Sequence, residues 1–128
     1  MTLYETKIIN SGIDAAMFRE ENMMILFGED APSELADYSY IIERNEVNGS
    51  ILPGMTLLIG ESQYEITAVG NVVNKNLLDL GHITLKFDGS VEAELPGTLY
   101  LENKKIPEVA IGTIIKIKWY STFIKFYY

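Results

Sequence analysis

The stretch YEITAVGNVVNKNLLDLGHITLKFDG, residues 64–89, reads as a strand, a helix and a second strand in series. Residues 64–69 are rich in aromatic and β-branched side chains, which favours a strand. Apolar residues recur near helical spacing through residues 70–80, and Gly81 is a typical helix stop. Residues 82–87 alternate between apolar and polar side chains and end at an Asp88-Gly89 turn. We therefore expect a helix of about three turns between two strands.

Short strands are also predicted on both sides of this stretch, each bounded by turn signals. They are residues 3–9, 23–27, 38–44, 55–59, 98–101 and 113–119. The residues GESQ between 55–59 and 64–69 predict a hairpin with a four-residue loop. Asp30 and Pro32 favour a brief helical turn, because the first suits a helix cap and the second a first turn.

These elements predict a mainly β protein, either a small antiparallel β-barrel or a closed sandwich, with one or two short helices. A closed sheet is favoured because closure removes exposed strand edges. With 128 residues and no linker or repeat, residues 1–128 are expected to form a single domain.

The composition excludes several kinds of chemistry. The chain has no cysteine, so it has no disulfide, thiolate nucleophile or iron–sulfur cluster. It has one histidine, His82, so a metal site built from several histidines is impossible. No acidic spacing resembles a calcium loop, and no glycine-rich run resembles a phosphate-binding loop. We therefore expect neither a metal nor a cofactor.

The charge is unevenly distributed along the chain. The formal net charge is −8, and residues 1–70 hold twelve acidic side chains but three basic ones. Phosphates repel such a chain, so we expect no nucleic acid or anionic membrane as a partner. The acidic half is either a solvated surface or a docking face for a basic protein. The docking hypothesis concerns four carboxylates in particular: Glu29, Asp30, Glu34 and Asp37.

Localisation follows from what the sequence lacks. No run of about 18 apolar residues is present, so we expect no membrane span. The N-terminal residues have no basic stretch before an apolar core, so they do not resemble a secretory signal. We therefore expect a cytoplasmic protein.

His82 is the residue to which catalysis is most readily assigned. A neutral imidazole serves as a base or as a nucleophile that accepts a phosphoryl group. The alternative is a structural histidine that hydrogen-bonds the preceding helix end or the next strand. Carboxylate pairs such as Glu20-Glu21 and Glu92-Ala93-Glu94 are more typical of solvated surface than of an acid–base site.

The segment AVGNVVNKNLLDLGHITLKFDGSVEAELPGTLYLE, residues 68–102, closely resembles the glucitol/sorbitol-specific enzyme IIA component of the sugar phosphotransferase system. The resemblance extends over about residues 3–115, and the tail from about 116 to 128 departs from it. Upstream matching positions fall in the same order: Phe27, Ala31-Pro32, Leu35, Tyr38, Ile41, Gly49 and Pro53-Gly54.

The resemblance implies a cytoplasmic phosphotransferase component. Such a component accepts a phosphoryl group on a histidine from the carrier HPr, which has a basic docking region. It then passes that group to the IIB unit of the sorbitol permease, which acts with the IIC unit. Any membrane association would be indirect, through the permease.

One departure from the family pattern concerns the acceptor itself. With Tyr38-Ser39-Tyr40-Ile41 matched, the family's phosphohistidine position falls on Ile42, which cannot accept a phosphoryl group. Two interpretations follow from the resemblance. Either the chain is a phosphorylation-deficient paralogue that regulates or competes for HPr or IIB, or His82 is the acceptor. His82 also has a match in the family pattern, so a supporting role at the phosphoryl group is a further possibility.

A hypothesis of another class is a small β-barrel module that binds a sugar or a protein without phosphoryl chemistry. Eight tyrosines supply candidates for stacking against a sugar ring, although strand residues also use tyrosine for packing. The C-terminal residues STFIKFYY, 121–128, are unusually aromatic. We expect them to pack on the domain or on a second copy, which makes a homodimer a hypothesis.

Overall fold

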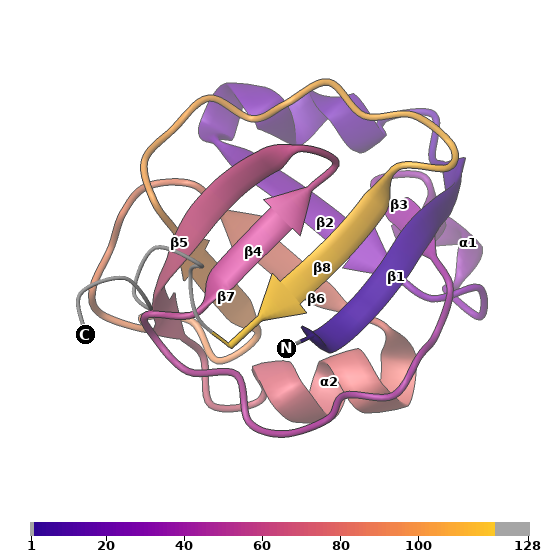
Figure 1. Ribbon diagram of the computed structural model, residues 1–128. Coiled ribbons are helices and arrows are strands. Elements are labelled where there is room, and N and C mark those ends of the chain that lie inside the picture. The colour runs from indigo at the N-terminus through magenta and orange to yellow at the C-terminus, as the bar shows by residue number, and fades with distance from the viewer. Residues whose placement is uncertain (1, 120–128) are drawn as a thin grey trace.

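A closed β-barrel forms the body of the molecule in the computed structural model, which describes residues 2–119 (Figure 1). The strands are β1 (Thr2–Ser11), β2 (Met23–Phe27), β3 (Tyr40–Ile42), β4 (Thr56–Ile59), β5 (Ser62–Val69), β6 (Ile83–Lys86), β7 (Thr98–Leu101) and β8 (Ile114–Lys118). The helical elements are the 3-10 helix η1 (Ala15–Glu21) and the α-helices α1 (Ser33–Ala36) and α2 (Val73–Leu80). The predicted mainly β fold and its closure are confirmed.

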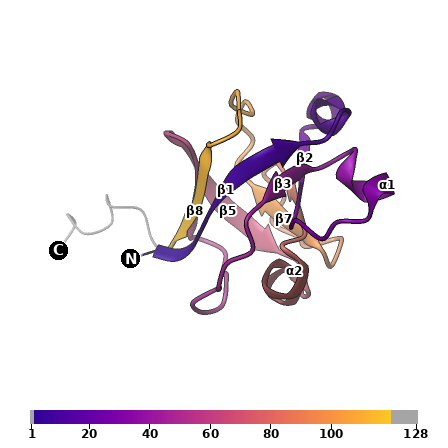
Figure 2. The same ribbon diagram turned by 90° about the vertical axis from the view of Figure 1, so that its right-hand side faces the viewer.

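The strands follow one another around the barrel in the order β1-β3-β2-β6-β7-β5-β4-β8, and β8 pairs again with β1. Two neighbouring pairs, β2–β3 and β6–β7, are parallel, and the other neighbours are antiparallel. The helix α2 lies across one end of the barrel, while α1 and η1 project together from another side (Figures 1 and 2). No helix among residues 2–119 is long and apolar enough to cross a membrane.

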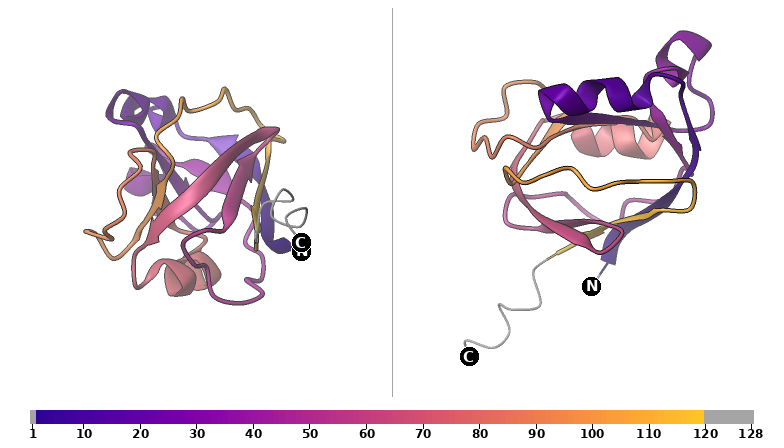
Figure 3. Two further views of the ribbon diagram at one scale, coloured as in Figure 1. Left: turned by 60° about the vertical axis from the view of Figure 1, so that its left-hand side comes forward. Right: turned by 90° about the horizontal axis from the view of Figure 1, so that it is seen from above.

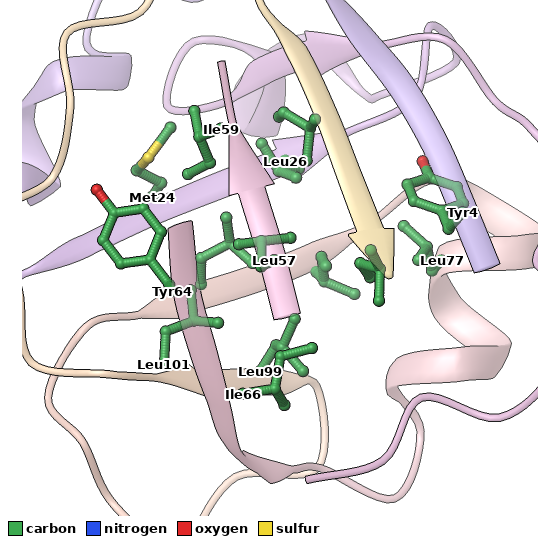
Figure 4. Close-up of a cluster of buried hydrophobic side chains, with 14 of the residues drawn as sticks. Tyr4, Met24, Leu26, Leu57, Ile59, Tyr64, Ile66, Leu77, Leu99 and Leu101 are labelled. Atoms are coloured by element: carbon green, nitrogen blue, oxygen red, sulfur yellow. The ribbon is translucent and has the colours of Figure 1, made fainter. Parts of the chain in front are cut away.

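Buried side chains fill the interior of the barrel (Figure 4). Strand β5 shows the alternation that produces this core, because Tyr64 and Ile66 are buried while Gln63 and Glu65 are exposed. Val73 and Leu77 from α2 join the same core. The filled interior leaves the barrel wall, its ends and its loops as the places where chemistry or binding can occur.

Several predicted elements have different bounds in the structure. The predicted helix over 70–80 begins at Val73, because the backbone N–H groups of Gly70 and Val72 donate to carbonyls of Thr98 and Pro96. The hairpin loop has two residues instead of four, since Ile59 pairs directly with Ser62. Gly60 in that loop has a φ of 57°, a conformation that glycine adopts readily.

The brief helical turn after Asp30 is present as α1, but its N-cap is Pro32, and no side chain caps it. Strand β3 is shorter than the predicted 38–44, because the N–H groups of Tyr38 and Ser39 donate back to the end of α1. The 3-10 helix η1 was not predicted from the sequence. The C-terminal segment 121–128, and with it the packing and homodimer hypotheses, lies outside the described residues.

Candidate functional site

His82 stands at the junction between α2 and β6. The helix ends at Leu80, and Gly81 then adopts a left-handed conformation with a φ of 65°. The backbone N–H groups of Gly81 and His82 donate to the carbonyls of Leu77 and Asn76, which closes the last turn of the helix. Strand β6 starts at the next residue, Ile83. His82 is therefore held by the helix end behind it and by the barrel wall ahead of it.

The imidazole ring has two well-defined neighbours in strand β2. Its Nδ1 lies 3.1 Å from the backbone carbonyl oxygen of Leu26. Because a carbonyl oxygen accepts hydrogen bonds and does not donate them, Nδ1 must hold the proton of this bond. The Phe27 ring stacks on the imidazole, with centroids 4.2 Å apart and planes 17° from parallel. In the neutral ring, Nε2 consequently holds the free lone pair.

This arrangement corrects the structural hypothesis for His82 in one respect. The imidazole itself bonds to the Leu26 carbonyl of β2, while the backbone N–H of His82 donates to the helix end. The ring is partly exposed, so a partner can reach it. An oriented, partly exposed imidazole with a free Nε2 has the chemistry of a nucleophile or a base.

Arg44 lies beside this junction and was not singled out from the sequence. Its methylene groups pack against the contact between Gly28 and Gly81. A Cβ added at Gly28 would lie 2.7 Å from the Arg44 Cγ, and one added at Gly81 would lie 3.3 Å from it. Its guanidinium donates to the Leu78 carbonyl at 3.3 Å and lies 3.6 Å from the Asp30 carboxylate. Both side chains are well exposed, so this ion pair is weak. Arg44 is thus a cation at the edge of the site. Its one sequence signal is its place two residues after Ile42.

Ile42 has a very different setting from His82. It lies in β3, pairs with Ile8 and is fully buried in the core. Strand β2 separates it from His82, because β2 pairs with β3 on one side and with β6 on the other. An isoleucine at this place packs the barrel and has no group that reacts.

The other sequence candidates are exposed carboxylates and mostly buried tyrosines. The carboxylates Glu29, Asp30, Glu34 and Asp37 are all exposed, on α1 and the segments that flank it. Among residues 2–119, no group of three or more His, Asp or Glu side chains is placed to hold a metal ion. Four of the five described tyrosines are buried, and Tyr38 alone of these five is exposed. Tyrosine in the described chain therefore serves mainly to pack the core.

The barrel fold matches a known class of protein. The crystal structure of a phosphotransferase-system IIA component from Enterococcus faecalis V583 superposes with a TM-score of 0.79 and 30% identity. The match covers 90% of this chain and 99% of that one. The fold is therefore that of a IIA component of this system.

The comparison of sequences defines the family. The family model described as "PTS system glucitol/sorbitol-specific IIA component" matches residues 3–116, and this chain belongs to that family. Two proteins named "PTS system glucitol/sorbitol-specific EIIA component", from Shigella flexneri and Escherichia coli (strain K12), are each 38% identical over 116 residues. Each match covers 91% of this chain and 94% of the relative. The predicted family is confirmed.

Proposed function

We propose that this chain is a cytoplasmic IIA unit that accepts a phosphoryl group from HPr on Nε2 of His82. It then passes that group to the IIB unit of a glucitol/sorbitol permease. The observation that carries the proposal is the bond between His82 Nδ1 and the Leu26 carbonyl, which leaves Nε2 as the nucleophilic atom. Family membership supports the partners and the sugar class.

The transfer needs no external base or cofactor. The Nε2 lone pair forms a new N–P bond while the P–N bond of the donor phosphohistidine breaks, and that electron pair returns to the donor ring nitrogen. Nδ1 keeps its proton, and the positive charge that the ring acquires is stabilised by the Leu26 carbonyl. Transfer to the next unit repeats the same exchange in the forward direction.

The surroundings of His82 favour this exchange. The stacked Phe27 ring fixes the plane of the imidazole, and alignment of the reacting atoms accounts for much of phosphoryl-transfer catalysis. Arg44, with its exposed guanidinium, is available to attract the equatorial oxygens of the transferred group. Ile42 contributes packing beside the site and no chemistry.

Incubation with phosphoenolpyruvate, enzyme I and HPr tests the proposal. We expect an acid-labile phosphoryl label, and because the chain has one histidine, the label must lie on His82. The informative variant is His82→Asn, whose amide can still donate to the Leu26 carbonyl but which has no nucleophilic nitrogen. It should fold normally and take no label. A native chain that takes no label contradicts the proposal.

A second function, that of a phosphorylation-deficient regulator or competitor, is favoured by one observation. The position at which the family pattern places the acceptor is Ile42, an apolar residue that is fully buried. If the native chain binds HPr or IIB but takes no label, this second function replaces the first. A sugar-binding module is not proposed, because the barrel interior is filled and four of the described tyrosines are buried.

A further inference from the structure

Exposed apolar side chains gather where η1 and α1 project from the barrel. Ile13 is 86% exposed, Met17 52%, Leu35 48% and Tyr38 38%. They come from two segments of the chain. Ile13 and Met17 lie in the connection between β1 and β2, and Leu35 and Tyr38 lie in α1 and just after it. We call these four residues the apolar patch. Side chains of this size are normally scattered singly on a surface, so a cluster of them suggests a binding role.

The two segments that form the apolar patch are fastened together by their backbones. Gly12 and Asp14 donate their N–H groups to the carbonyls of Ser39 and Asp37, each at 2.8 Å. A Cβ at Gly12 would lie 2.1 Å from the Ala36 carbonyl oxygen, so the close approach requires glycine there. The Phe18 and Tyr38 rings also pack together, with centroids 5.9 Å apart. The apolar patch is therefore formed before any partner arrives.

Three carboxylates lie directly next to members of the apolar patch in the sequence, and we call them the acidic rim. Asp14, Glu34 and Asp37 are exposed neighbours of its members in sequence, and the ion pairs formed within residues 2–119 use other acidic side chains. Arg19, the basic residue of η1, donates instead to the carbonyls of Ile106 and Pro107. The rim is thus strongly negative around an apolar centre.

The apolar patch is also connected to the His82 site. Phe27, on which His82 stacks, is followed directly by residues 28–32 and then by α1. Figures 2 and 3 show α1 and η1 standing beside one another on the same side of the barrel. Asp30, in this connection, lies 3.6 Å from Arg44 at the edge of the His82 site, so the connection joins the two places.

We propose that the apolar patch and its acidic rim form the docking surface for a carrier protein with a basic face and a protruding apolar side chain. This inference rests on the proposed function for the identity of the carrier, which is HPr. Charge complementarity selects this partner: a second copy would bring an acidic rim against an acidic rim, and anionic lipid or nucleic acid would be repelled. The apolar centre supplies affinity, and the rim supplies encounter rate and selectivity.

Binding of unphosphorylated HPr tests the inference by biolayer interferometry. The double variant Ile13→Ser/Leu35→Ser should bind HPr about tenfold more weakly than the native chain. The matched control is Val91→Ser/Leu95→Ser, which removes two exposed apolar side chains, 80% and 59% exposed, from the β6–β7 connection. It should change the affinity less than about twofold. Thermal unfolding of both variants checks that each one folds.

The rim is tested with Glu34→Gln/Asp37→Asn. This variant should lower the association rate several-fold at low salt while the dissociation rate changes little, and added salt should reduce the difference. The inference is overturned if the Ile13→Ser/Leu35→Ser chain binds HPr as the native chain does, or if the native chain does not bind HPr. Binding by His82→Asn separates docking from phosphoryl transfer. If the native chain takes no label but its binding is weakened by Ile13→Ser/Leu35→Ser, the docking inference stands and only phosphoryl transfer is removed.

Discussion

Tyr4 places a buried hydroxyl group in the otherwise apolar core of the barrel. Its side chain is 2% exposed, and its hydroxyl has no hydrogen-bond partner among the described residues. The neighbouring Thr6 hydroxyl donates instead to the backbone carbonyl of Glu43 at 2.7 Å. Burial raises the pKa of Tyr4 from the ordinary 10 to about 12, and the Glu43 carboxylate acts in the same direction, while Thr6 opposes it. The fold therefore strongly prefers the neutral phenol.

We predict that Tyr4→Phe leaves the free energy of unfolding at pH 7 within about 1 kcal/mol of the native value, because an unpartnered hydroxyl contributes little. The pKa of Tyr4 is about 12 in the folded chain and about 10 in the unfolded chain. Its contribution to the free energy of unfolding is therefore complete below pH 10 and is lost as the pH rises through about 12. It amounts to roughly 2–3 kcal/mol. Denaturant titrations from pH 8 to 12 should therefore show a smaller alkaline loss of stability for Tyr4→Phe than for the native chain.

The control for this prediction is Tyr64→Phe. The Tyr64 hydroxyl donates to the Lys105 carbonyl at 2.7 Å, so its removal should cost about 1 kcal/mol at pH 7. If Tyr4→Phe proves as costly at pH 7, or loses stability above pH 10 as fast as the native chain, the Tyr4 hydroxyl has a hydrogen-bond partner and the prediction is wrong.

At the scale of elements, the contact between Gly28 and Gly81 joins the end of β2 to the end of α2. The Gly28 N–H donates to the Leu80 carbonyl at 3.0 Å. A Cβ at Gly28 would lie 2.6 Å from that carbonyl oxygen, which belongs to rigid backbone. The contact fixes the turn that presents His82, so its integrity matters to the site as well as to the fold.

We predict that Gly28→Ala lowers the free energy of unfolding by about 2–3 kcal/mol, because the added methyl forces the two elements apart. Gly60→Ala is the matched control: nothing lies within 4 Å of its added Cβ, so only its φ of 57° is penalised, by about 1 kcal/mol. Urea unfolding measures both. Equal costs for the two variants would show that β2 and α2 separate without penalty.

The elements also show what sequence alone could predict. The β-rich class, α1, α2 and its stop at Gly81 follow from local patterns, which is why these predictions are confirmed. The start of α2 does not follow from a local pattern, because Gly70 and Val72 donate backbone hydrogen bonds to Thr98 and Pro96, at and just before the start of β7. The missed η1 has four apolar residues followed by three charged ones, a block pattern without helical periodicity, and its one buried residue is Ala15.

The candidate site was predictable to the same limited extent. A single histidine after a helix stop drew attention to His82, and the family pattern drew attention to Ile42. The Leu26 carbonyl that determines the tautomer is 56 residues away, and the Phe27 stack depends on the pairing of β2 with β6. Arg44 reaches the site by packing over two glycines, which no local pattern records.

At the scale of the whole molecule, the barrel owes its closure to one late strand. Strand β8 pairs with β1 on one side and with β4 on the other, so it joins the first strand of the chain to the middle of it. Without β8, both neighbours would present unpaired edges, which favour association between chains. Because so many pairings join distant parts of the sequence, we expect folding as one cooperative unit.

Ile117 tests this closure. It is 1% exposed, pairs with Tyr4 in β1 and with Leu57 in β4, and so contributes to both sides of the seam. We predict that Ile117→Ala lowers the free energy of unfolding by about 2–5 kcal/mol through loss of buried surface and the cavity left behind. Unfolding should remain a single transition, with circular dichroism and the fluorescence of Trp119, the chain's one tryptophan, changing together.

The neighbouring Lys118 provides the control, since it faces outward from the same strand and is only partly buried. Lys118→Ala should change the free energy of unfolding by less than about 0.5 kcal/mol. The two substitutions therefore compare the inside and outside of one strand at adjacent residues. If the two probes separate in Ile117→Ala, so that fluorescence changes well before circular dichroism, the β8 seam opens on its own. The barrel would then have to be regarded as a sheet with a detachable closing strand.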